Sequence, residues 1–280
     1  MPLTTYGCYQ WGVSHDLASP LVHHLLHGSG SLDLAVALLA EEEQDGLRAD
    51  EVIAALDDLA ASLHVREGAN SFEAVARLNQ RLFTEVGFAG DAGDYYNPQN
   101  SFLNRVITRK RGLPIALSVI YLEVARRAGV VMGGIGFPGH FLVSTRATAD
   151  EPRFFVDPFY AGQIHTEDEL RGRLKQMELA GRNPNSFLDP SSNTEIVLRM
   201  TYNLKGSYLR LRRHPDALRQ IDRVLKLAPE RTEEHRDRGL LLAEMGEVEE
   251  ALVALSVYLE LTPQAHDRDI ISDIMVELSH

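Results

Sequence analysis

The sequence predicts an α+β protein in which helical regions at both ends flank a short stretch of antiparallel sheet. Two kinds of pattern support this prediction. Before residue 88 and after residue 194, apolar residues recur at the three- and four-residue spacing of amphipathic helices. Within 130–157, short runs of β-branched and aromatic residues are separated by turn formers, as in a sheet. We therefore expect a helical N-terminal region (1–88), a mixed core (89–190) and a helical C-terminal region (191–280).

The composition favours a soluble cytoplasmic protein. Of the 280 residues, 44% are hydrophobic and 24% are charged, which is ordinary for a globular chain. No apolar run approaches the roughly 18 residues of a membrane span, and no secretory signal is visible, so we expect no membrane partner. The single cysteine, Cys8, excludes an intrachain disulfide. The net charge of -12 disfavours nucleic acid as a partner.

The N-terminal region predicts helices in "LDLAVALLAEEE", "ADEVIAALDDLAASL" and "SFEAVARLNQRLFTEVGF". His23, His24 and His27 lie close together in sequence, but no cysteine or suitably spaced carboxylate completes a metal site. We interpret them as histidines on a helix surface, and we expect no metal or other cofactor.

The middle region begins with a turn-rich loop at 89–100 and continues into "RGLPIALSVIYLEVARRAGV". Pro114 suits the first position of a helix, and Gly129 suits its C-terminal end. The residues between them are apolar on nearly every face, which is typical of a buried helix. We therefore expect a central helix over 114–128.

Three strands are predicted at 130–137, 140–145 and 153–157. A hairpin centred near 148–149 places His140 opposite Asp157, where neighbouring strands lie about 4.8 Å apart. An aspartate that accepts from one ring nitrogen raises the basicity of the other, so this pair is a candidate catalytic dyad. The alternative is that His140 caps a turn and Asp157 ends a strand.

The C-terminal region contains a repeat. Ala217 corresponds to Ala251 and Pro229 to Pro263, both 34 residues apart, as in tetratricopeptide repeats. This predicts helices at 194–211, 215–228, 231–244 and 248–261, with a final helix at 265–279; an unrelated helical bundle is the alternative. Because solenoids usually need three or more repeats, we expect these two to pack against the middle region.

The strings "NSFLNRVITRKRGLPIALSVIYLEVARRAGV", "FPGHFLV" and "VDPF" resemble the SirB family, from about Ala35 to the C-terminus. This resemblance implies a transglutaminase-like, papain-related domain at 89–190, followed by tetratricopeptide repeats at 191–280. It also implies that His140 and Asp157 occupy the histidine and aspartate positions of that fold. The position of the nucleophilic cysteine corresponds to Pro114, which has no nucleophile.

Two residues are candidate substitutes for the missing thiol. Ser118 shares a helical face with Pro114, but a hydroxyl there is expected to bond a backbone carbonyl. Cys8 lies far away in sequence in an aromatic, uncharged setting, where it is expected to be a small buried hydrophobe.

Further candidate cleft residues fall in the resembling string or just before it. They are Asn100, which we expect to cap the helix at 101–110, Asn104, Arg109, Tyr95 and Tyr96. For each of them a packing role is the alternative.

Two functions remain open from the sequence. The first is a non-catalytic, regulatory scaffold that docks a protein or peptide partner through its repeats, which the absent cysteine favours. The second is an acyl-transfer or peptide-hydrolysing enzyme with His140 as base, Asp157 as its orienting partner, and water or Ser118 as nucleophile. The oligomeric state is not predicted.

Overall fold

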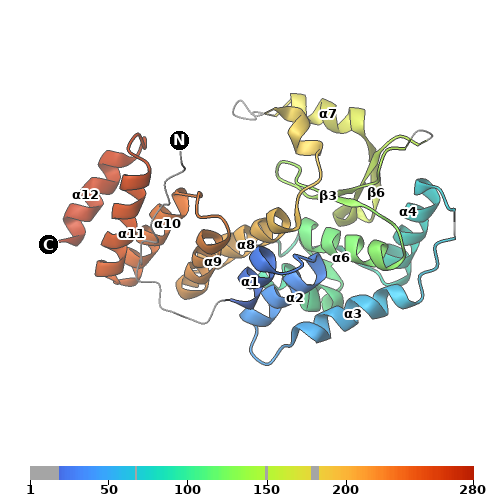
Figure 1. The fold of residues 1–280 in the computed structure, drawn as a ribbon, viewed down its shortest axis with the longest axis horizontal. Helices are drawn as coiled ribbons and strands as arrows, with labels where there is room; N and C mark the ends of the chain where they lie inside the picture. The colour runs from blue at the N-terminus through green and yellow to red at the C-terminus, as the bar shows by residue number, and fades with distance from the viewer. Residues whose placement is uncertain (1–18, 67, 149–150, 178–182) are drawn as a thin grey trace, which may run out of the picture.

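The structure, a computed structural model, describes residues 19–66, 68–148, 151–177 and 183–280. In these ranges, helices surround one small four-stranded sheet and then continue as an array of hairpins toward the C-terminus (Figure 1). The expected α+β class is confirmed. None of the helices in these ranges combines the length and the apolar character that crossing a bilayer requires.

The N-terminal helices wrap one side of the core. Their apolar faces pack against the central helix, so they are not a separate bundle. His24 is buried and its ring lies 3.0 Å from the carbonyl of Ser31, which corrects its expected place on the surface. The elements are α1 (Pro20–His27), α2 (Leu32–Glu43), α3 (Ala49–Ala61), α4 (Ser71–Asn79) and a π-helical turn, η1 (Gln80–Glu85).

The central helix α6 (Pro114–Arg127) is buried along its length up to Ala125, as its uniformly apolar sequence predicts. Short elements lead into it. A parallel bridge between two-residue strands pairs Gly90 with Gly112 just before the helix begins. These elements are β1 (Ala89–Gly90), η2 (Pro98–Asn100), α5 (Leu103–Arg109) and β2 (Arg111–Gly112).

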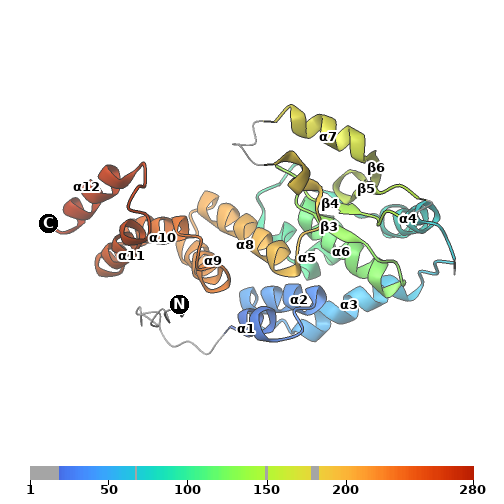
Figure 2. The same ribbon diagram turned by 45° about the horizontal axis from the view of Figure 1, so that its top comes forward.

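The sheet is antiparallel in the order β3 (Gly133–Ile135), β4 (Leu142–Ser144), β5 (Phe154–Asp157) and β6 (Gln163–Thr166). One face, with Phe141, Val143 and Val156, packs on the core that contains α6. The other face is covered by α7 (Glu167–Lys175) and η4 (Pro184–Leu188), as Figure 2 shows. The sequence did not predict β6, because its mostly exposed "QIHT" lacks an apolar alternation.

The register of β4 and β5 differs from the predicted one. Val143 pairs with Val156, so extending the ladder puts Leu142, and not His140, level with Asp157. The error is two residues. A slip of two keeps every side chain on its original face, so His140 becomes the diagonal neighbour of Asp157.

The C-terminal helices follow the repeat pattern. Ala217 and Ala251 are buried where helices meet, and a Cβ on Gly239 would lie 2.6 Å from Leu255. The five helices match the expected ranges within three residues: α8 (Asn193–Arg210), α9 (His214–Leu227), α10 (Glu233–Met245), α11 (Val248–Leu261) and α12 (Arg268–Leu278).

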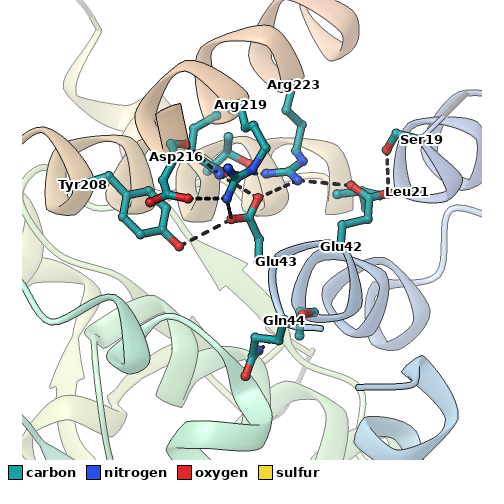
Figure 3. Close-up of polar contacts among 12 residues, drawn as sticks. Ser19, Leu21, Glu42, Glu43, Gln44, Tyr208, Asp216, Arg219 and Arg223 are labelled. Atoms are coloured by element: carbon teal, nitrogen blue, oxygen red, sulfur yellow. Dashed lines mark hydrogen bonds and ion pairs between the residues drawn. The ribbon is translucent and has the colours of Figure 1, made fainter. Parts of the chain in front are cut away.

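The first repeat packs against the N-terminal helices through a buried polar network (Figure 3). The Glu43 side chain, 0% exposed, accepts hydrogen bonds from Arg223 at 2.9 Å and Gln220 at 2.7 Å. Arg223 also donates to Glu42 at 3.1 Å. The repeats were expected to pack against the middle region, but this network joins the first repeat to α2 of the N-terminal region. Ion pairs from Arg223 to Glu42 and Glu43 therefore connect α9 to α2.

Candidate functional site

His140 and Asp157 meet at one end of the β4–β5 pair. The imidazole Nε2 lies 2.7 Å from Oδ2 of Asp157, whose side chain is 3% exposed. The other oxygen, Oδ1, accepts the backbone N–H groups of Phe159 at 3.0 Å and Tyr160 at 3.3 Å. Asp157 therefore both holds the imidazole and caps the turn η3 (Pro158–Tyr160) that follows β5.

A tight turn presents His140 beside that carboxylate. Gly139 adopts a φ of 68°, in the region that favours glycine, and the His140 N–H donates to the Phe137 carbonyl at 3.0 Å. Arg199 of α8 secures the turn from outside, since its Nη2 donates to the carbonyls of Phe137 at 2.9 Å and His140 at 2.6 Å. The corner is thus held by the sheet and by the first helix of the repeats together.

No nucleophile is paired with the imidazole in the described ranges. The ring's hydrogen-bond partner there is Asp157, and α6 begins with Pro114 after a Leu113 that supplies no side-chain cap. Ser118 is 0% exposed and its Oγ donates to the Phe141 carbonyl at 3.3 Å. Cys8 lies outside the described residues.

Asn100 and Arg109 shape the loop before η2. Asn100 is fully buried, donates from Nδ2 to the Asp94 carbonyl at 2.7 Å, and accepts from Nη1 of Arg109 at 2.7 Å. Arg109 also reaches Asp91 at 3.3 Å. The prediction that Asn100 caps the helix at 101–110 was wrong. The N-cap residue of α5 is Phe102, and the Asn100 side chain bonds the loop at Asp94 instead.

Asn104 is placed elsewhere. It exchanges hydrogen bonds with the Gln44 side chain at 3.0 and 3.2 Å, next to the end of α2. The structure therefore brings Asn100 and Arg109 near the predicted tyrosines but does not bring Asn104 to the His140 corner.

Tyr95 and Tyr96 extend the corner into an aromatic surface. Ring centroids are 5.4 Å apart for Tyr95 and Tyr96, 6.4 Å for Tyr95 and Phe159, and 5.9 Å for Phe159 and His140. Tyr160 lies 6.0 Å from the imidazole and is 62% exposed. Gly90 packs so closely on Phe159 that a Cβ there would lie 2.5 Å from the ring. We call Tyr95, Tyr96, His140, Phe159 and Tyr160 the aromatic surface.

Two arginines of α8 border the aromatic surface. The Arg210 guanidinium lies over the Tyr96 ring at 4.4 Å, and Arg199 lies over Phe141 at 5.5 Å. Burial lowers the pKa of Arg199 from its ordinary value, although an arginine stays charged near neutrality. Burial also raises the pKa of Tyr95, which keeps its phenol neutral. Neither arginine was predicted from the sequence as a site residue, although their separation by eleven positions on one helix places them on the same face.

A metal site has no support in the described ranges, where no group of three or more His, Cys, Asp or Glu residues is arranged to hold an ion. His23 and His27 contact each other, with ring centroids 5.4 Å apart, while His24 turns into the core.

Comparison with known proteins gives two family matches. The transglutaminase-like superfamily matches residues 50–202, and the tetratricopeptide repeat matches residues 204–275. The first match starts inside α3 and ends within α8, so it includes the His140 corner and Arg199, which secures it.

Several relatives align over most of their length. A UPF0162 protein of Xylella fastidiosa is 39% identical over 211 residues, which cover 74% of either chain. A UPF0162 protein of Vibrio cholerae is 30% identical over 79% of this chain and 80% of its own. Protein SirB1 of Salmonella typhimurium is 28% identical over 69% of this chain and 71% of its own. No solved structure matches the chain.

Proposed function

The chain belongs to the SirB family of transglutaminase-like proteins with tetratricopeptide repeats, and from this premise we propose that it is a non-catalytic scaffold for a protein or peptide partner. The proposal places it in the cytoplasm, with a regulatory effect exerted through the partner. An acidic chain repels phosphate backbones, so contact with nucleic acid has no part in it.

One observation carries the proposal. The first position of α6, where a transglutaminase-like enzyme would need its nucleophile, is a buried proline. The nearest hydroxyl on the same face, Ser118, is sealed in the core and already bonded to a carbonyl. Nucleophilic catalysis needs a nucleophile within hydrogen-bond reach of its base, and neither residue supplies one.

The repeats support the binding half of the proposal. Stacked helical hairpins form extended concave surfaces that suit peptides and helices. Here the stack is anchored to the core through Glu43 and Arg223, so a partner bound to the repeats would be held at a fixed position relative to the aromatic surface.

The second candidate function is hydrolysis or acyl transfer by the His140–Asp157 pair. The contact of 2.7 Å between a side chain that is 15% exposed and a buried carboxylate favours it, since this is how a general base is oriented. Water would then have to be the nucleophile.

A turnover assay separates the two functions. Purified full-length protein and His140→Ala are incubated with acyl-donor peptides and a fluorophosphonate hydrolase probe, with His266→Ala as a matched control that removes an exposed histidine. The scaffold proposal predicts no product and no labelling in any of the three. Turnover by wild type and His266→Ala, but not by His140→Ala, would contradict the scaffold proposal and support the enzymatic function.

A further inference from the structure

Arg199 is a half-buried cation that has no acidic partner among the residues that the structure describes. Its Nη2 donates to two backbone carbonyls, and among the described residues no acceptor is bonded to its Nη1 or Nε. The other half-buried or buried arginines differ. Arg127 contacts Glu123, Asp33 and Asp57, and Arg223 contacts Glu42 and Glu43. In a chain with 40 acidic and 28 basic residues, a half-buried guanidinium that no carboxylate of the described residues reaches is unusual.

Arg199 and Arg210 lie on one face of α8. Eleven residues at 3.6 per turn complete just over three turns, so the two arginines are aligned and about 16 Å apart along the helix. Asn203 and Gly206 lie on the same face between them. Gly206 is exposed, and a Cβ placed on it would meet no atom within 4 Å, so this strip of the helix is open to solvent.

The aromatic surface borders this strip. Tyr96 lies under Arg210, and Arg199 donates to the carbonyl of His140, which is part of the aromatic surface. Tyr96 is 49% exposed and Tyr160 is 62% exposed, so both rings offer apolar area to a ligand. Exposed aromatic rings beside arginines are a composition enriched at the centres of protein interfaces.

We propose that the Arg199–Arg210 face of α8 and the aromatic surface together bind an extended acidic peptide segment of a partner protein. A carboxylate of the segment pairs with Nη1 of Arg199, a second one reaches Arg210, and apolar side chains rest on Tyr95, Tyr96 and Tyr160. An extended chain rises about 3.3 Å per residue, so 16 Å corresponds to carboxylates about five residues apart.

The positive charge of the two arginines favours an acidic ligand. Arginine forms its strongest contacts with carboxylate and phosphate groups, and an aromatic surface adds little to the affinity for a free ion. The inference rests on the proposed binding function and adds to it the place and the chemistry of the partner.

The test begins with selection of a phage-displayed random dodecapeptide library on the full-length protein. Selected peptides are synthesised with a fluorescent label, and their affinities are measured by fluorescence anisotropy for wild type, Arg199→Gln, Arg210→Gln and Tyr160→Ala. Arg66→Gln is the matched control, because it removes an exposed arginine, 70% accessible, from the loop before α4. Circular dichroism and thermal unfolding verify the fold of each variant.

We expect enrichment of two acidic residues four to six positions apart, with aromatic or aliphatic residues between them. Arg210→Gln weakens binding up to about fivefold, as for an exposed pair, and Arg199→Gln by about tenfold or more. Arg66→Gln leaves the affinity unchanged. Arg199 also secures the turn at Phe137, so Arg199→Gln can unfold the protein. In that case the affinities of Arg210→Gln and Tyr160→Ala test the inference.

The failures can be told apart. Peptides without carboxylates that bind all variants equally would overturn this inference and leave the scaffold in place. No peptide binding at all would overturn both. Acetate or inorganic phosphate that displaces the peptide stoichiometrically, with the same sensitivity to Arg199→Gln, would show a small-anion site and overturn the peptide as occupant.

Discussion

Replacing Glu43 by alanine tests how the repeats are attached to the rest of the molecule. Its carboxylate accepts four hydrogen bonds, from Arg223 at 2.9 Å, Gln220 at 2.7 Å, Arg219 at 3.3 Å and Tyr208 at 3.4 Å. Figure 3 shows Arg223, Arg219 and Tyr208 directed toward it. Removing one partner of a buried ion pair costs about 3 to 5 kcal/mol, because the remaining charge stays buried.

The expected loss of unfolding free energy lies at the lower end of that range, about 3 kcal/mol, because Arg223 keeps its contact with Glu42 at 3.1 Å. For a protein of this size, such a loss lowers the midpoint of thermal unfolding by roughly 6–12 °C. Calorimetry and urea denaturation of the full-length protein measure both quantities.

Glu260→Ala is the matched control, since it removes an exposed glutamate at the end of α11. A double-mutant cycle of Glu43→Ala with Arg223→Ala should be non-additive, because the second change then removes a charge that has already lost a partner. If Glu43→Ala costs no more than Glu260→Ala, or if the cycle is additive, the network does not hold the two parts together.

Three other predictions follow from the core and the repeats. Asn100→Ala removes the bonds to Asp94 and Arg109, so we expect a loss of about 2–3 kcal/mol and faster amide hydrogen exchange over 91–97; unchanged exchange would contradict the role of Asn100 in the loop. Ser118→Ala should change stability by no more than about 1 kcal/mol in urea denaturation, since it loses one long bond of 3.3 Å to a carbonyl; a loss of several kcal/mol would mean that the hydroxyl is part of a larger network. Burial and the Arg238 charge lower the pKa of His235 from its usual 6.5, so the unfolded chain takes up a proton first and stability falls as the pH drops below 6.5. His235→Gln should therefore lose less stability than wild type between pH 7.5 and pH 5.5, and equal losses in denaturation curves would contradict this sign.

The elements that the sequence predicted correctly depend on patterns within a single segment. The apolar run after Pro114 predicted α6, and the 34-residue offset predicted the helices of the repeats. Both depend on spacing within one segment, which a single sequence contains.

Contacts between distant segments were harder to predict. The His140–Asp157 contact was expected from a register that was wrong by two residues, and it formed because such a slip preserves the face. The role of Asn100 was predicted wrongly. Its side chain bonds Asp94 and Arg109 and not the start of the helix, and local sequence does not distinguish these two possibilities.

Some features left a signal that went unused. The three glutamates that end α2 oppose the helix dipole, which indicates that they have partners elsewhere in the chain. Arg223 pairs with Glu42 and Glu43, and Glu41 accepts from the backbone N–H of Ala49. The hydrogen bond from Arg199 to the His140 carbonyl joins residues 59 positions apart, and no pattern near either residue predicts it.

The central claim, that the molecule binds a peptide without transforming it, is tested most directly by following the mass of a bound peptide. A peptide selected on the full-length protein is incubated with it for hours and recovered for mass spectrometry, together with the intact protein. The account predicts that both masses stay unchanged. Cleavage of the peptide, or an acyl adduct on the protein, that occurs in wild type and not in His140→Ala would contradict it.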